Sequence, residues 1–109
     1  MARDKKLLRQ TFRDVCLKRD QYRCAYCKWK PNPENIEKDL DVHHITNRND
    51  MPNGGYVLEN GISLCGGCHY NAEQYLQNGS CRDFAASKLY IIINSSYERA
   101  IEASKLLKN

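Results

Sequence analysis

The first apolar pattern along the chain has the spacing of a helix. Between residues 4 and 19, apolar side chains recur every three or four positions, and the residues between them are polar and largely basic. The recurring residues are Leu8, Phe12, Val15 and Cys16. Because one face of an α-helix repeats about every 3.6 residues, the pattern predicts an amphipathic helix with a buried apolar face and a basic outer face.

Two later segments have the composition of short strands. Residues 40–45 (LDVHHI) and residues 60–64 (NGISL) carry β-branched and other apolar side chains, as strands do. Residues 47–55 between them are rich in Asn, Gly and Pro, which is typical of turns. We therefore expect two short strands that are separated by a loop.

The rest of the chain predicts two helices and one ambiguous segment. A helix is expected over residues 69–77, with Gly79 just beyond its C-terminal end. Residues 95–98 (SSYE) have the pattern of a capping box and would begin a last helix that runs to Leu107. Residues 83–93 end in an apolar run that fits either a strand or a buried helix.

Length and composition exclude some classes of protein. The chain has 109 residues, a mean hydropathy of −0.73 and no internal repeat or linker, so we expect a single domain over residues 1–109. No apolar run approaches the length of about 18 residues that a membrane span needs. The charged N-terminus is not followed by an apolar segment, as a signal peptide would be. We therefore expect a cytoplasmic protein with no membrane partner.

The net charge of +4 is unevenly distributed. Residues 1–30 hold ten basic and three acidic residues, whereas residues 31–109 hold seven basic and ten acidic residues. Such an asymmetry indicates contact with a polyanion at one end of the molecule, although a solvated basic helix face would have the same composition.

Four of the six cysteines form two CxxC pairs, Cys24 with Cys27 and Cys65 with Cys68. This spacing lets two thiolates of one turn reach one ion at about 2.3 Å, which is the geometry of a structural zinc site. A redox CxxC motif or disulfides are the alternatives, but neither a βαβ setting nor an export signal supports them. Glycines after Cys65 are expected to adopt a positive φ in the second knuckle.

The two remaining cysteines fall outside this pattern. Cys16 lies on the apolar helix face and is expected to be a small buried residue. Cys81 follows a polar turn and has no assigned role. A disulfide between these two is an alternative that a reducing compartment disfavours.

The histidines and one asparagine lie between and beside the cysteine pairs. The order is Cys24-x-x-Cys27, Asp41-Val42-His43-His44-Ile45, Leu58-Glu59-Asn60 and Cys65-x-x-Cys68-His69. With this order, the chain from about Phe12 to Gln77 resembles the HNH endonuclease family. The resemblance implies a small α+β domain with the ββα-metal (His-Me finger) fold, a zinc-knuckle pair, and flanking N- and C-terminal helices.

The resemblance also implies roles for single residues. His43 and His69 would bind a catalytic divalent cation. His44 would be the general base, and Asn60 would brace the loop that holds the base. Independently, neighbouring residues of a strand point to opposite faces, so His43 and His44 suit different tasks. Two imidazole ligands favour Mn²⁺, Ni²⁺, Co²⁺ or Zn²⁺ over Mg²⁺. Glu73 would either join this site or be a solvated carboxylate.

These residues together predict a metal-dependent endonuclease that hydrolyses DNA phosphodiester bonds. No module that reads bases is recognisable, so we expect nicking with low sequence specificity. Arg48 would hold the scissile phosphate. Further phosphates would be neutralised by Lys5, Lys6, Arg9, Arg13, Lys18 and Arg19. The alternatives are an inactive, zinc-stabilised nucleic-acid-binding module and an accessory nuclease subunit of a phage DNA-packaging machine. A homodimer would be needed for concerted double-strand cleavage.

Overall fold

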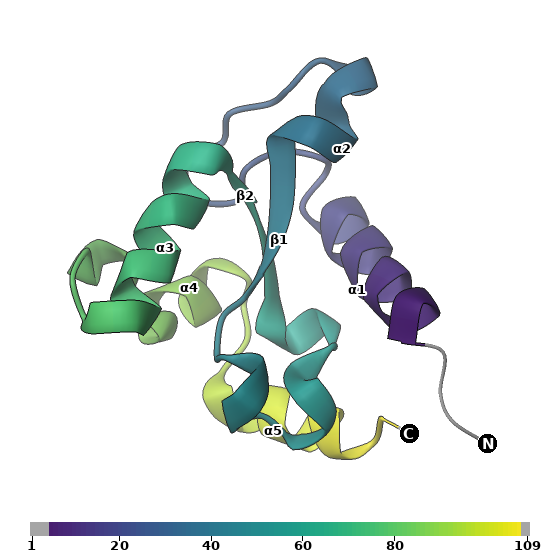
Figure 1. Ribbon diagram of the computed structural model, residues 1–109, viewed down its shortest axis with the longest axis vertical. Coiled ribbons are helices and arrows are strands. Elements are labelled where there is room, and N and C mark those ends of the chain that lie inside the picture. Colours follow the sequence, from purple (N-terminus) through teal and green to yellow (C-terminus); the bar gives the residue numbers. More distant parts are fainter. Residues whose placement is uncertain (1–4, 108–109) are drawn as a thin grey trace.

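A short antiparallel hairpin forms the centre of the molecule, and helices cover both of its faces (Figure 1). The structure is a computed structural model that describes residues 5–107. Its helices and strands are α1 (Lys5–Arg19), α2 (Ile36–Asp39), β1 (Leu40–His44), β2 (Gly61–Cys65), α3 (Gly66–Asn78), α4 (Ala86–Ile92) and α5 (Tyr97–Lys105). Short 3₁₀ turns connect them, among them η2 (Arg48–Asp50), η3 (Pro52–Gly55), η4 (Leu58–Asn60) and η5 (Arg82–Phe84).

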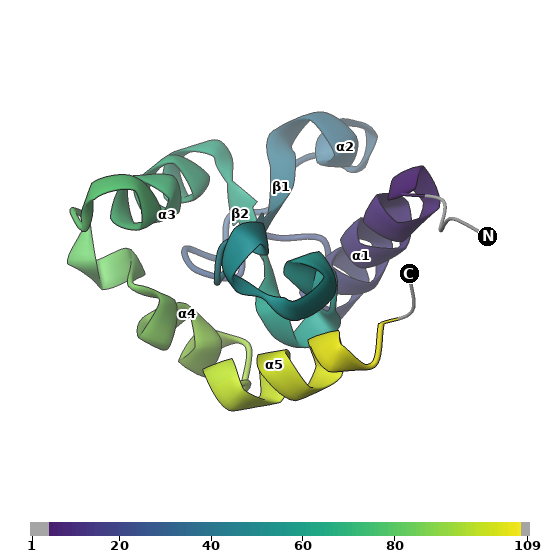
Figure 2. The same cartoon turned by 60° about the horizontal axis from the view of Figure 1, so that its bottom comes forward.

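The hairpin confirms the two expected strands. β1 pairs with β2 so that His43 faces Ile62 and His44 faces Gly61 across the ladder. Helix α1 lies on one side of the hairpin and α3 on the other, as Figure 2 shows from a second direction. The strand–helix arrangement β1–β2–α3 is the ββα unit that the sequence predicted, and the molecule as a whole is a small α+β domain.

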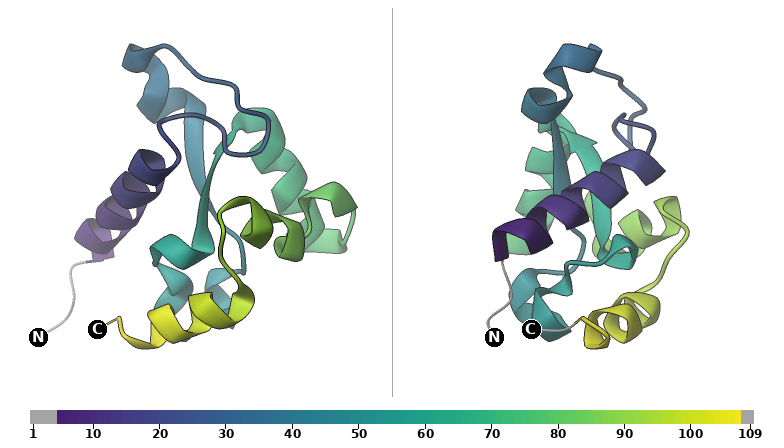
Figure 3. Two further views of the ribbon diagram at one scale, coloured as in Figure 1. Left: turned by 180° about the vertical axis from the view of Figure 1, so that it is seen from behind. Right: turned by 90° about the vertical axis from the view of Figure 1, so that its right-hand side faces the viewer.

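Helix α1 packs closely on the hairpin at Gly61. A Cβ atom at that glycine would lie 2.5 Å from the Cys16 sulfur and 2.7 Å from the Phe12 ring. Leu8, Phe12, Cys16 and Leu17 are buried, but Val15 is 42% exposed. The predicted apolar face was therefore wrong at Val15, because the helix turns Leu17 rather than Val15 into the core. In the right panel of Figure 3, α1 crosses in front of the hairpin.

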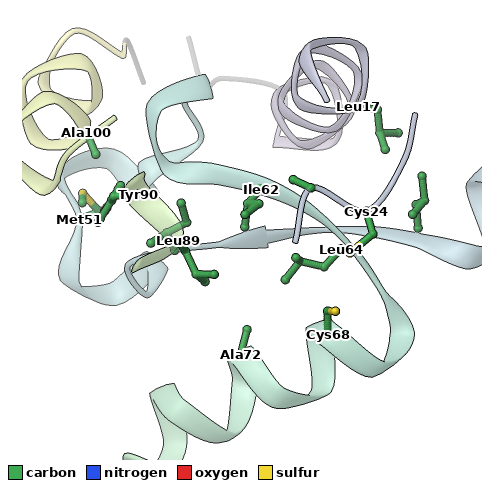
Figure 4. Close-up of a cluster of buried hydrophobic side chains, with 13 residues drawn as sticks. Leu17, Cys24, Met51, Ile62, Leu64, Cys68, Ala72, Leu89, Tyr90 and Ala100 are labelled. Atoms are coloured by element: carbon green, nitrogen blue, oxygen red, sulfur yellow. The ribbon is translucent and has the colours of Figure 1, made fainter. Parts of the chain in front are cut away.

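The core lies between the hairpin, α3 and the C-terminal helices (Figure 4). Ile62 and Leu64 from β2 meet Ala72 from α3 and Leu89 from α4 there, and all four are at most 1% exposed. Residues 83–93, which fitted either a strand or a helix, form η5 and α4. No helix within residues 5–107 is long and apolar enough to cross a membrane.

Several element ends differ from the sequence prediction. Helix α3 begins three residues before His69, because Cys65 already takes the N-cap position. It ends at the expected Gly79, which has a φ of 77°. The N-cap of α5 is Ser96, whose hydroxyl accepts a hydrogen bond from the Arg99 N–H, and not Ser95 as the capping-box pattern predicted. Helix α5 stops at Lys105 instead of Leu107.

Candidate active site and cysteine cluster

The two CxxC pairs come together at one end of the hairpin. Cys24 and Cys27 lie in the turn after α1, Cys65 ends β2, and Cys68 lies in the first turn of α3. The four sulfur atoms all lie within 4.8 Å of one another, and the sulfurs of Cys27 and Cys65 are 3.8 Å apart. A tetrahedron with zinc–sulfur bonds of about 2.3 Å requires sulfur–sulfur distances of about 3.8 Å. The four-cysteine cluster therefore fits a structural zinc site.

Within the first knuckle, the surroundings of Cys24 favour a thiolate. The Cys27 backbone N–H donates a hydrogen bond to the Cys24 sulfur over 3.4 Å. Burial by itself would raise the pKa of Cys24, but backbone N–H groups of Cys27, Cys65 and Tyr26 outweigh it and lower the pKa to about 7. Zinc binds the thiolate form of cysteine, so this arrangement suits the ion.

One detail of the cysteine predictions is corrected by the structure, and the disfavoured disulfide is not formed. The glycines at 66 and 67 have no positive φ, because they belong to the first turn of α3. A disulfide between Cys16 and Cys81 is absent: Cys16 is fully buried and Cys81 is exposed, and both are free. Burial raises the pKa of Cys16 to about 12, which fits the expected inert core residue.

A second cluster forms where β1 faces α3. Because side chains alternate along a strand, Asp41 and His43 point toward α3 and meet His69 and Glu73. The Glu73 Oε1 atom lies 3.3 Å from His43 Nδ1 and 3.3 Å from His69 Nε2. His69 Nδ1 lies 3.1 Å from a carboxylate oxygen of Asp41. Three potential ligands, His43, His69 and Glu73, thus lie close together. Asp41 contacts the ring nitrogen of His69 that does not face Glu73.

The donor set of this second cluster fits a divalent cation. Ligand atoms of His43, His69 and Glu73 all lie within 4.8 Å of one another. His43 is only 2% exposed, and its Nε2 atom is buried with no hydrogen-bond partner within the described residues. Burial lowers the pKa of His43 to about 4, against the opposing charge of Glu73, so the ring is neutral near pH 7 as a ligand must be. Of the two alternatives for Glu73, this geometry favours the site over the solvated carboxylate.

His44 points to the opposite face of the hairpin, toward α1. Its ring stacks on Phe12 with a centroid distance of 4.6 Å and meets the edge of Tyr56 at 4.8 Å. Its Nε2 atom is buried and has no hydrogen-bond partner in the part of the chain that the structure describes. Burial, reinforced by the positive charge of Arg48, lowers the pKa of His44 to about 4. The two aromatic rings therefore fix the orientation of a neutral imidazole that can accept a proton.

Two hollows meet at His44. One has a volume of about 260 Å³ and is lined by His43, Glu73 and Arg48 among others. The second has a volume of about 350 Å³ and extends toward Arg9 and Tyr56. His44, Arg48 and Val42 line both hollows. A ligand could therefore contact both the His43 cluster and the basic side chains of the second hollow.

Asn60, for which the family resemblance implies a bracing role, is hydrogen-bonded to the loop between the strands. It is fully buried. Its Oδ1 accepts hydrogen bonds from the Thr46 N–H over 3.0 Å and from the Tyr90 hydroxyl over 2.8 Å. Its Nδ2 donates to the carbonyls of Thr46 and Gly55 over 3.1 and 3.2 Å. The amide thus ties both ends of residues 46–55, the loop that carries Arg48, to the end of β2.

The basic residues of α1 divide into two groups. Lys5, Lys6, Arg9 and Lys18 are exposed on the surface of the helix. Arg13 pairs with Glu37 over 3.2 Å. Arg19 pairs with Asp20 and donates to the carbonyls of Leu58 and Gly61. Arg19 therefore helps to hold α1 against the hairpin, and we do not include it among the proposed phosphate contacts.

Sequence reasoning missed three residues of this region. Asp41 could have been found, because it lies two positions before His43 and so shares its strand face. Tyr56 lies in the turn-rich loop and Tyr90 in the ambiguous apolar segment. Neither tyrosine belongs to a periodic pattern, and only the folded chain brings them to His44 and Asn60.

Comparison with known proteins agrees with this geometry. Residues 24–74 match the model of the HNH endonuclease family. No curated protein and no solved structure matches the chain. The matched segment runs from the first cysteine of the first CxxC pair through both strands to Glu73 and its neighbour in α3. Residues 24–74 therefore match the HNH endonuclease family, and this segment contains both CxxC pairs and the His43–His69–Glu73 cluster.

Proposed function

We propose that this protein is a metal-dependent endonuclease that hydrolyses phosphodiester bonds of DNA, nicking with low sequence specificity. One observation carries the proposal: the side chains of two adjacent histidines of β1 point to opposite faces of the hairpin. His43 meets His69 and Glu73 on α3, whereas His44 lies between aromatic rings beside Arg48. A metal ligand must point to the cation, whereas a general base must point to the attacking water. Neighbouring strand residues point to opposite faces, so His43 and His44 suit these two roles.

His43, His69 and Glu73 would hold the catalytic cation. The cation would supply positive charge for the phosphoryl group and the leaving oxygen. Asp41 accepts the Nδ1 hydrogen of His69, so the lone pair of Nε2 faces the ligand cluster. Two imidazoles and one carboxylate suit Mn²⁺, Co²⁺, Ni²⁺ or Zn²⁺ at least as well as Mg²⁺.

His44 would remove a proton from the attacking water. Its Nε2 is enclosed by protein, which leaves Nδ1 as the nitrogen to accept the proton. Its lowered pKa keeps the ring neutral before the reaction. Phe12 and Tyr56 prevent the ring from turning, and Asn60 holds the loop that follows β1.

Arg48 would hold the scissile phosphate. Its side chain lines the hollow that also contains His43, His44 and Glu73. A guanidinium group offers five donors in a planar fork, so it can bind two phosphate oxygens together. The exposed lysines of α1 would neutralise neighbouring phosphates without reading the bases.

Cleavage of supercoiled plasmid DNA over a panel of divalent cations tests this function. We expect the protein to produce open circles, and His44→Ala to lose at least about a hundredfold in rate, since general-base catalysis contributes that much. Tyr70→Ala is the matched control, because Tyr70 is an aromatic residue of α3 that is 64% exposed and lines neither hollow. Cleavage by His44→Ala at the wild-type rate would exclude His44 as the base. No cleavage by the wild type with any cation, together with retained DNA binding, would favour an inactive binding module.

A further inference from the structure

Two arginines converge on one hydroxyl group in the second hollow. Arg48 Nη1 donates a hydrogen bond to the Tyr56 hydroxyl over 3.1 Å, and the Arg9 side chain lines the same hollow, where its positive charge acts on the same oxygen. Arg9 comes from α1 and Arg48 from η2, so residues far apart in the sequence supply the two positive charges. Like charges repel each other. Two guanidinium groups that lie near a single neutral oxygen would therefore be stabilised by an anion bound beside them.

No carboxylate within residues 5–107 forms an ion pair with either arginine. Asp41 also lines this hollow, but its carboxylate is engaged with His69. Burial would raise the pKa of Tyr56, yet the hydrogen bonds and charges of Arg48 and Arg9 outweigh it and lower the pKa. The surroundings of the Tyr56 oxygen therefore favour negative charge.

The position of the Tyr56 hydroxyl and its two arginines relative to His44 indicates what they could bind. The Tyr56 ring meets the His44 ring at 4.8 Å, and Arg48 lines both hollows. The two hollows share His44 and Arg48, so a DNA strand whose scissile phosphate lay beside His43 and Glu73 could continue past His44 into the second hollow. The next charged group along the strand is the neighbouring phosphate.

We propose that Arg9, Arg48 and the Tyr56 hydroxyl form a subsite for the phosphate adjacent to the scissile one on the same strand. This inference rests on the proposed function, because it takes the scissile phosphate to lie beside His43. Arg48 would bridge the two phosphates, since its five donors exceed what the Tyr56 oxygen uses. Arg9 lies outside residues 24–74, so α1 would contribute directly to binding at the HNH domain.

Binding of short thymidine oligonucleotides tests the subsite without requiring cleavage. Affinity is measured by NMR titration of the zinc-loaded protein with no other divalent cation added. In the wild type, a trinucleotide with two diesters should bind roughly tenfold more tightly than a dinucleotide with one. In Arg9→Gln this gain should fall to about twofold, which the choice of two registers alone provides. Short ligands are needed because a long duplex would average many registers.

A second variant and a modified ligand make the result decisive. Tyr56→Phe keeps the ring against His44 and removes only the hydroxyl, so it should also reduce the gain from the second diester. A trinucleotide whose second diester is an uncharged methylphosphonate should bind the wild type no more tightly than the dinucleotide does. Arg82→Gln removes one exposed charge outside both hollows and should leave the gain at about tenfold.

Either of two results would overturn the subsite. One is an equal gain in the wild type, Arg9→Gln and Tyr56→Phe. The other is a gain that persists with the methylphosphonate, since it would come from sugar or base contacts. Failure of the endonuclease proposal appears separately, as intact plasmid with every cation, because the titrations measure binding alone.

Discussion

Asn60 shows how one side chain can hold the loop between two strands. All four hydrogen-bonding positions of its buried amide are used, and its partners come from the loop, from η3 and from α4. Gly55 has a φ of 67°, and a Cβ atom there would lie 2.7 Å from Asn60 Nδ2, so only glycine allows this approach. The resemblance predicted the asparagine, but not the Tyr90 hydroxyl that completes its bonding.

Asn60→Ala should destabilise the protein by about 3 kcal/mol, because it leaves several buried partners without a hydrogen bond. Urea unfolding of the zinc-loaded protein measures the change. Asn49→Ala serves as the control, since Asn49 is exposed in η2 and its side chain has no contact of this kind. Equal stability of the two variants would show that the amide does not brace the loop.

Asp41→Asn should weaken binding of Mn²⁺ by about tenfold, because carboxylates behind a histidine ligand orient it and raise its basicity. Isothermal titration calorimetry of the zinc-loaded protein with Mn²⁺ measures the affinity directly. Asp83→Asn is the matched control, because Asp83 is exposed and pairs only with Lys88. An unchanged affinity in Asp41→Asn would exclude Asp41 from positioning His69.

At the scale of elements, the contact between α1 and β2 determines where Arg9 and Phe12 stand. The helix can approach the strand only because residue 61 has no side chain. Phe12 then reaches the His44 ring, and Arg9 reaches Tyr56. The periodicity of the sequence predicted the helix and its basic outer face. It did not predict which strand the helix covers, because periodicity reports a buried face and not its partner.

Gly61→Ala should cost about 1–3 kcal/mol in the free energy of unfolding, as overpacking in a close-packed core does. It should also lower nuclease activity, since α1 must move away from the hairpin. Gly66→Ala is the control, because a Cβ there meets nothing within 4 Å. Thermal unfolding followed by circular dichroism compares the two, and an equal effect would contradict the close approach at Gly61.

Helix α4 illustrates why an apolar run alone leaves the element undecided. Leu89 and Tyr90 are buried, whereas Ile91 is 75% exposed. Strand alternation would have buried Leu89 and Ile91 on one face, and a helix instead buries neighbours that lie near one another around its axis. The run of β-branched isoleucines favours a strand, so packing against the core and the Tyr90–Asn60 hydrogen bond outweighed this local preference.

For the molecule as a whole, the cysteine cluster joins residues that lie far apart in the sequence, Cys24 and Cys27 with Cys65 and Cys68. It links the turn after α1, the end of β2 and the start of α3. Helix α1 carries Arg9, β2 pairs with the strand that carries His44, and α3 carries His69. A domain of this size has a small core. A metal ion bound by cysteines from three segments would therefore contribute a large share of its stability. The zinc site therefore supports the candidate active site at a distance.

Removal of zinc by a strong chelator should lower the melting temperature by well over 10 °C, about what a loss of several kcal/mol produces in a domain of this size. Cys65→Ser should reproduce this loss and bind less than one zinc per chain. Cys81→Ser should retain full zinc content, because Cys81 is exposed and lies outside the cluster. Elemental analysis and calorimetry measure both quantities, and an unchanged melting temperature after chelation would contradict a structural role.

The sequence by itself determined the groups whose geometry is local. The CxxC spacing places two sulfurs within one turn, and strand alternation separates His43 from His44 onto opposite faces. Only the tertiary structure decided which distant side chains complete these groups. Glu73 joins His43, Tyr90 completes the bonding of Asn60, and Arg9 meets Arg48 at Tyr56. The physical reason is that periodicity encodes which side of an element is buried, whereas the partner on that side depends on how whole elements pack.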